Sequence, residues 1–445
     1  MSASRIASSP KLLWTTALVL SLVLSIMAAL RGGYIGPDYN THMDRLVNWS
    51  EIFDFSTTSP PSYYLLGHLL FRVIGSNNAF PISLSIIQAA INCLALWWFF
   101  EYTQHRFRSP LIHLGLVFFA TFLPAQVIHA TTIGTDWATV PLFVLSLFLF
   151  DKFLAHDPAK PQHAALLGFG LTVAIAFKYS FMALLPALFV LFVCFAWTRR
   201  WHVPRFIAIS ILALLLPSAF SLCTFLASRP VHGYLTEKHW LQKGMPPDMN
   251  YKDLLLVKSA DLRLFAAPEY FKRDILRAHQ HSYLGLLQLG IFSDTMNLFQ
   301  KLSVPQRFGD VLIPDQKTRL PWKTPVMQTS MSLGIVWTIL VLIATPVSVF
   351  RAVAHLLANK FQREDAAVIF GIAYFLLIFL PIPFVHGGAL FGYWTPRLIL
   401  PSLLCFALAG FLFLDRNIVK KSSKGAAAVL AFIFLQCMTE IVMLV

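Results

Sequence analysis

Long apolar runs separated by short polar segments recur along the whole chain. A membrane-spanning helix needs roughly 20 consecutive apolar residues. On that measure the pattern predicts an all-α polytopic membrane protein with about eleven transmembrane helices. Their expected positions are 12–30, 80–100, 110–129, 137–154, 164–178, 180–198, 204–227, 327–350, 366–385, 397–414 and 425–445.

Composition supports the same class of protein. Of the 445 residues, 57% are hydrophobic and 13% are charged, whereas soluble proteins carry roughly 25% charged residues. Such a chain is not disordered, collagen-like or a secreted disulfide scaffold. The net charge is +14, but much of the basic excess lies in short loops between apolar runs, where it sets topology. We therefore expect no nucleic-acid partner.

Basic residues occupy alternate loops, which orients the predicted helices. Arg5 and Lys11 precede the first run, so the positive-inside rule places the N-terminus in the cytoplasm. The later basic loops are 105–108, 152–160, 199–205, 351–363 and 416–424. This topology divides the chain into an N-terminal transmembrane module 1–227, a large non-cytoplasmic loop 228–326 and C-terminal transmembrane helices 327–445.

The segment 60–75 is apolar but too short to cross a membrane. Proline at positions 60 and 61 favours a helix start, because the missing N–H is not needed there. We expect an interfacial helix on the outer membrane face, with Tyr63 and Tyr64 at headgroup level and Arg72 near its end. The alternative is a small packing helix without chemistry.

Two carboxylates follow apolar runs on the predicted outer side. Asp38 comes after the first run, and Asp136 lies in the short turn before the run 137–154. If a helix begins at Asp38, then Asp38 and His42 share a face at i, i+4. Each carboxylate could equally serve as a helix cap. With His42 and His129 they could also hold a hard divalent metal, although the spacing fits no strong motif.

Two cations occupy equivalent positions at the outer boundary. Lys178 follows an apolar run, and Arg397 begins one. Such residues usually snorkel, but they could bind a phosphate at the headgroup level. Apart from Lys178, hardly any charge falls within a run, whereas ion-coupled transporters usually need ionisable groups inside the bilayer.

Taken in order, these elements resemble the GT-C superfamily of membrane glycosyltransferases, in the branch of protein mannosyltransferases and the lipid A aminoarabinose transferase. The matching features are Asp38, the Pro-Pro-Ser-Tyr-Tyr-Leu-Leu stretch 60–66, Asp136, the Lys-Tyr-Ser triplet 178–180 and the Arg-Leu-Ile-Leu-Pro stretch 397–401. The resemblance covers roughly 12–200 well and 390–414 weakly. The chain departs from many relatives at Tyr39, where they have Glu, and at Ser59, where they often have His.

The resemblance implies a polyprenyl-phosphate-linked sugar as donor and a lipid, glycan or protein hydroxyl as acceptor. A single inverting displacement needs one carboxylate to take the acceptor's proton, and cations to stabilise the leaving phosphate. Asp38 would be the base and Asp136 a supporting carboxylate. Lys178 and Arg397 would contact the phosphate.

The remaining substrate contacts would come from His42, Tyr63, Tyr64 and Arg72. The sequence requires no cofactor, although a divalent metal on Asp38 and Asp136 stays open. Because no eukaryotic retrieval signal is visible, we expect a bacterial inner membrane, with the active site facing the periplasm.

Three alternatives remain from the sequence alone. The first is a polysaccharide polymerase or ligase using diphosphate-linked lipid, which would depend on outer-loop residues such as Arg229, His232, His279 and His281. The second is a lipid or sugar transporter. The third is a non-catalytic scaffold, since polar residues at helix ends can be caps alone.

Overall fold

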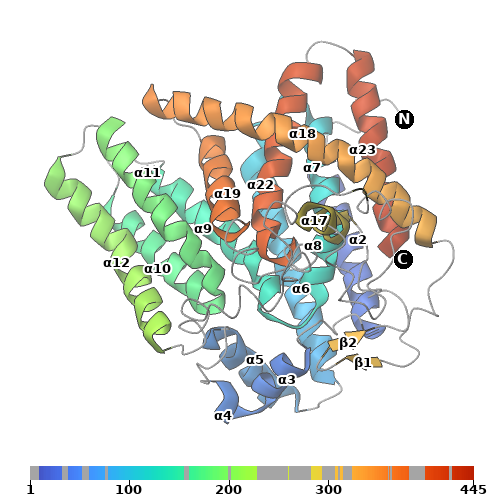
Figure 1. The fold of residues 1–445 in the computed structure, drawn as a ribbon, viewed down its shortest axis with the longest axis horizontal. Helices are drawn as coiled ribbons and strands as arrows, with labels where there is room; N and C mark the ends of the chain where they lie inside the picture. The colour runs from blue at the N-terminus through green and yellow to red at the C-terminus, as the bar shows by residue number, and fades with distance from the viewer. Residues whose placement is uncertain are drawn as a thin grey trace.

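The computed structural model is almost entirely helical over the residues it describes (Figure 1). These residues are 10–32, 39–52, 60–75, 79–154, 160–198, 202–227, 259, 282–292, 306–308, 311–313, 323–358, 360, 363–379, 396–419 and 423–444. One small antiparallel hairpin, β1 (Gln306–Phe308) with β2 (Val311–Ile313), accompanies the helices.

The first half of the helical bundle runs from α2 to α12. Its elements are α2 (Pro10–Leu30), α3 (Tyr39–Val47), α4 (Trp49–Ile52), α5 (Pro61–Ile74), α6 (Ala79–Gln104), α7 (Pro110–Phe122), α8 (Pro124–Thr131), η1 (Thr135–Ala138), α9 (Thr139–Leu154), α10 (Pro161–Phe177), η2 (Tyr179–Ala183), α11 (Leu184–Thr198) and α12 (Val203–Ala227). The second half comprises α17 (Tyr283–Phe292), α18 (Lys323–Leu357), α19 (Arg363–Phe379), α22 (Pro396–Leu414), the π-helical turn η5 (Asp415–Val419) and α23 (Ser423–Leu444).

Six helices in the described residues are long and apolar enough to cross a membrane. The bent pair of α7 and α8 would add a seventh, since the two pass the same test together with a 47° bend. The other predicted spans correspond to α9, with 16 residues, and to three other apolar helices of 10–17 residues, Pro161–Phe177, Asp365–Ile378 and Ala427–Val442. The membrane class is thus supported, while the count of eleven and the topology stay predictions.

Proline explains several of the helix boundaries. Pro61, Pro110, Pro124 and Pro161 each stand at the first position of their helix, where a missing N–H costs nothing. At Pro124 the consequence is a bend, because proline cannot continue the hydrogen-bonding pattern of α7. The predicted helix 110–129 is therefore two helices rather than one.

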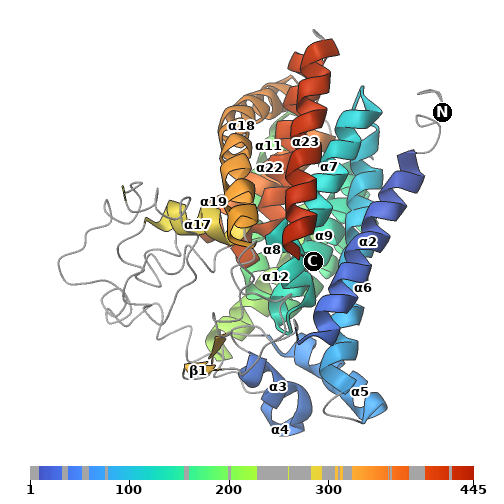
Figure 2. The same ribbon diagram turned by 90° about the vertical axis from the view of Figure 1, so that its right-hand side faces the viewer.

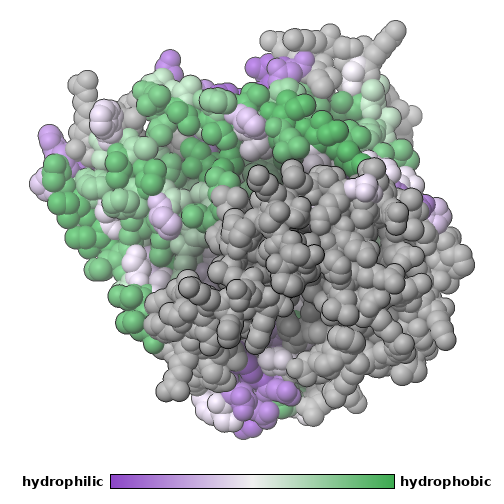
Figure 3. All heavy atoms as spheres, viewed as in Figure 1, coloured by the Kyte–Doolittle hydropathy of each residue, from purple (hydrophilic) through white to green (hydrophobic). Residues whose placement is uncertain are grey.

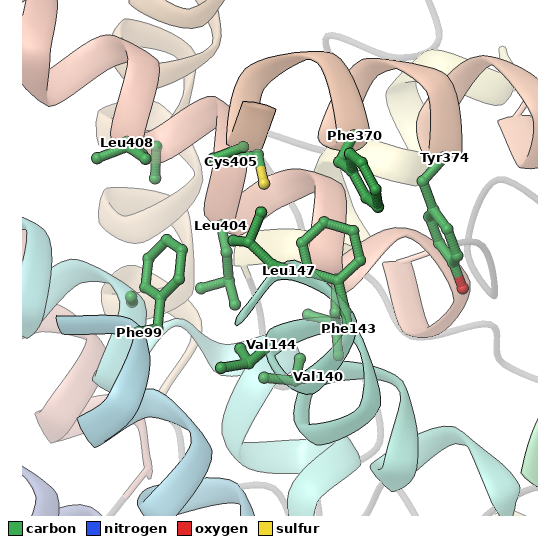
Figure 4. Packing of buried hydrophobic residues seen from close by; sticks show 14 of the residues in the cluster. Phe99, Val140, Phe143, Val144, Leu147, Phe370, Tyr374, Leu404, Cys405 and Leu408 are labelled. Atoms are coloured by element: carbon green, nitrogen blue, oxygen red, sulfur yellow. The ribbon is translucent and has the colours of Figure 1, made fainter. Parts of the chain in front are cut away.

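The core lies where α6, α9, α19 and α22 meet. Buried side chains from these four helices interlock, including Phe99, Phe143, Phe370 and Leu404 (Figure 4). The outside carries large exposed apolar side chains such as Phe350 and Leu342, and Figure 3 shows this apolar surface over the upper part of the molecule. An apolar exterior over packed helices is the arrangement that a lipid environment favours.

The two ends of the bundle differ. At one end, α2 begins beside the end of α6, where Lys11 pairs with Glu101 at 2.5 Å. Nearby, the buried Asp415 accepts hydrogen bonds from the backbone N–H groups of Arg108 and Ser109. At the opposite end, α3, α4 and α5 lie together across the bundle (Figure 2).

Candidate functional site

A small apolar cluster fixes α3, α4 and α5 against the bundle. It is separate from the main core and contains Leu46, Ile52, Tyr63, Tyr64 and Phe80 among its buried members. Gly67 allows α5 to approach α3, because a Cβ there would lie 2.2 Å from a methyl carbon of Leu46. These contacts hold the polar face of α5 in a defined place.

His42 lies inside this assembly rather than in solvent. It is buried, and its Nδ1 lies 2.7 Å from the Tyr64 hydroxyl. The two rings are stacked with centroids 5.8 Å apart. On the other side, His42 Nε2 lies against Gly134, where a Cβ would stand only 3.1 Å away. Glycine at 134 therefore leaves room for the imidazole beside the turn that carries Asp136.

Arg45 is a buried cation on the same helix face. Its guanidinium carbon lies 3.9 Å from the centroid of the Tyr64 ring, which is a cation–π contact. Its Nε donates to the carbonyl of Glu51 at 3.0 Å, and one terminal nitrogen donates to Ile52 at 3.1 Å. Arg45 thereby joins α3, α4 and α5.

Tyr63 is held from the bundle side by α6. Gln88 Nε2 donates to its hydroxyl at 3.0 Å. Burial raises the pKa of Tyr63 above its usual value, and the neighbouring Tyr64 adds to the shift. One turn further along α6, Asn92 Nδ2 donates to the carbonyl of Trp137 at 3.0 Å, so α6 also holds the turn η1.

Lys178 and Asp136 form an ion pair at this end of the bundle. The lysine Nζ donates to the Asp136 carboxylate, and also to Thr135 Oγ1 at 3.0 Å. The two side chains are only 16% and 14% exposed. Lys178 has extended backbone at the end of α10, which directs the chain into η2.

The turn η2, which follows Lys178, is held by a hydrogen bond of its own. Ser180 Oγ lies 2.7 Å from the hydroxyl of Tyr374 on α19, so α19 holds the turn η2 that follows Lys178. A carboxylate that already holds a lysine is better suited to orient that cation than to take a proton. The role of Asp136 as a supporting carboxylate stays a prediction.

The outer face of α5 is apolar. Leu66, Leu69 and Val73 are more than half exposed and follow a helical spacing on one side. Arg72 is exposed beside them. The tyrosines face inward, which reverses the usual amphipathic pattern. An outward apolar row and an inward polar row suit a helix whose outer neighbour is lipid.

The structure brings five of the predicted site residues together: His42, Tyr63, Tyr64, Asp136 and Lys178. Arg72 lies on α5 but points outward.

Two other predicted site residues are not placed. Asp38 lies outside the described residues. Arg397 belongs to α22, but its side chain is also outside them. The metal prediction depends on Asp38 and stays open, although the described part of the chain holds no group of three metal-binding side chains.

Sequence reasoning did not single out Arg45, Gln88 and Asn92. Each of these three residues has a sequence feature that points to a buried polar contact. Arg45 follows His42 by three residues and so shares its helix face. Gln88 and Asn92 are polar residues four apart inside an apolar run, where an amide side chain needs a buried partner.

No protein-family model matches this sequence, and no curated protein matches it.

Proposed function

We propose that this protein is an integral membrane glycosyltransferase. It would move a sugar from a polyprenyl-phosphate donor to an acceptor hydroxyl on the non-cytoplasmic face. A bacterial inner membrane is the proposed location, with the site open to the periplasm. The acceptor class covers lipids, glycans and proteins.

The observation that carries the proposal is the largely buried Lys178–Asp136 pair beside α5. A lysine fixed by a carboxylate and by Thr135 is a preorganised positive charge, and such a charge stabilises a leaving phosphate. The apolar row Leu66, Leu69 and Val73 supplies a surface along which a polyprenyl chain can lie. Phosphate and lipid chain would thus be bound by neighbouring elements.

The proposed reaction is one inverting displacement. The acceptor oxygen forms a bond to the anomeric carbon as the bond from that carbon to the phosphate oxygen breaks. The electron pair leaves with the lipid phosphate, which faces Lys178 and Arg397. The acceptor proton passes to Asp38. His42, Tyr63 and Tyr64 would contact the sugar or the acceptor.

The test is turnover of the purified protein with a panel of polyprenyl-phosphate sugars, followed as release of the lipid phosphate. Lys178→Met should lower the rate about 10²–10³-fold, the usual loss for one positioned electrostatic contact. Lys11→Met removes a lysine that is paired with Glu101 at the opposite end and should leave the rate unchanged. Equal turnover in the Lys178 and Lys11 variants would exclude the proposed phosphate contact.

A further inference from the structure

A carboxylic acid lies inside the helix bundle near the end of α23. Glu440 has no exposed surface, and neither has Gln436 one turn earlier. Gln436 Nε2 donates to Glu440 Oε1 at 2.5 Å. Ionisable residues in apolar helices are costly and are usually functional. This site is far along the chain from the residues of the proposed transferase site and does not depend on that function.

Three helices meet along one chain of hydrogen-bonding contacts, from Glu440 through Gln436 and Ser330 to Phe292. Gln436 Nε2 also lies 3.5 Å from Ser330 Oγ on α18. Ser330 in turn donates to the carbonyl oxygen of Phe292 at 2.8 Å. Phe292 is the last residue of α17, so its carbonyl has no intrahelical partner. The helix dipole makes that end of α17 negative.

Two buried acceptors in this cluster lack a donor. Glu440 Oε2 and Gln436 Oε1 have no hydrogen-bond partner among the described residues. Within the same residues, Gln436 is the side chain that hydrogen-bonds the Glu440 carboxyl, and no cation interacts with it. A buried carboxylate without a positive partner is strongly unfavourable, so a proton or a cation must neutralise it.

We propose that Glu440, Gln436 and Ser330, with the Phe292 carbonyl, bind a monovalent cation when the Gln436 amide turns its oxygen in place of its nitrogen toward the ion, and that Na⁺ and a proton compete for the site. Carboxylate, amide, hydroxyl and carbonyl oxygens are ligands that suit Na⁺. Helix C-terminal ends bind Na⁺ or protons in other membrane proteins. Binding of Na⁺ releases the proton of Glu440, so the charge in the site is the same in both states.

Among the residues that the structure describes, the titratable groups around Glu440 supply no alternative counter-ion. Cys437 interacts with Glu440 from the same helix, but its thiol carries no positive charge. Among the elements packed on α23, α7 carries His113, η5 carries Asp415 and Arg416, and α18 carries Arg351 and His355. The side chain of Lys323, also on α18, lies outside the described residues. Gly115 of α7 meets Ile433 at the middle of α23, about two turns before Glu440.

The test uses dicyclohexylcarbodiimide, an apolar reagent that adds to a protonated carboxylic acid. The purified full chain is labelled in NaCl or in choline chloride at equal concentration, and mass spectrometry follows the peptide that contains Glu440. We expect Na⁺ to slow labelling, about elevenfold at ten times its dissociation constant. Gln436→Leu should keep the label and lose the protection by Na⁺.

Two variants and one stability measurement serve as controls. Glu440→Gln should remove the label from this peptide, whereas Glu101→Gln, which alters an exposed carboxylate, should not change it. Thermal stability of the unmodified chain should rise with NaCl and not with choline chloride, which tests the site even if a variant fails to fold. Equal labelling in both salts, or no label at Glu440, would overturn the proposal.

Discussion

Removing one partner of the Lys178–Asp136 pair should destabilise the protein measurably. The two side chains are 16% and 14% exposed, so Lys178→Met leaves the Asp136 carboxylate largely buried without its lysine. Breaking a buried pair in this way costs about 3–5 kcal/mol. Because some solvent access remains, we expect about 3 kcal/mol, the lower end of that range.

The double variant separates stability from chemistry. Lys178→Met combined with Asp136→Leu removes both charges, and replacing a whole buried pair by apolar groups is often neutral. Most of the lost stability should therefore return. Sugar transfer should not return, because the positive charge proposed to face the leaving phosphate is still missing.

The assay is denaturant unfolding in mixed micelles, with the free energy of unfolding of each variant compared with the original chain. Lys11→Met is the matched control, because its pair with Glu101 is 56% and 37% exposed. Exposed pairs contribute up to about 1 kcal/mol. If Lys178→Met were no worse than Lys11→Met, or if the double variant were no better than the single variants, the energetic reasoning would be refuted.

Three further predictions concern other parts of the fold. A Cβ at Gly168 would lie 2.6 Å from the backbone oxygen of Leu212, so Gly168→Val should separate α10 from α12 and cost up to about 3 kcal/mol; unchanged unfolding would contradict this close approach. Asp415→Ala removes the acceptor of two backbone N–H groups and should cost roughly 1–2 kcal/mol, with faster hydrogen exchange at Arg108 and Ser109. Burial raises the pKa of Tyr63, so the unfolded chain loses this proton first, and stability should fall as pH rises above about 10. The Tyr63→Phe variant should lose less stability at alkaline pH than the original chain. A pH profile of stability identical to that of the original chain would contradict this prediction.

The helices were predictable because their signal is local. The apolar segment 60–75 corresponds to α5, Pro61–Ile74, since proline marks its start and Gly75 its left-handed end. The same local signal was present at Pro124 but was outweighed by the continuous apolar run 110–129. Helix α18 extends beyond the predicted 327–350 at both ends, because its polar termini lie outside the apolar window.

The site was predictable only in part, because it is assembled from distant segments. Asp136 and Lys178 each stood at the end of a run, but no sequence spacing reveals that they form a pair. The sequence predicts Tyr64 at headgroup level, which stays a prediction, but it does not predict that Tyr64 is buried against His42. Its hydroxyl finds a buried partner there, which only the packing of α3 on α5 can provide.

The mean hydropathy of a long apolar run does not reveal a single ionisable residue such as Glu440. The sequence predicts an ordinary span over 425–445, because a single carboxyl hardly changes the mean hydropathy of the run. The partners of Glu440 come from Gln436 on the same helix and from Ser330 on another. A polar residue four positions before an intramembrane acid was the available sequence signal.

The most direct test of the account is sugar transfer by the purified chain beside Asp38→Asn. With a productive polyprenyl-phosphate sugar, the original chain should release the lipid phosphate and form a product of inverted anomeric configuration. Asp38→Asn should insert and fold normally and lose about 10²–10⁴-fold in rate, the usual contribution of a general base. Full activity of Asp38→Asn, or a product with retained configuration, would contradict the proposed mechanism.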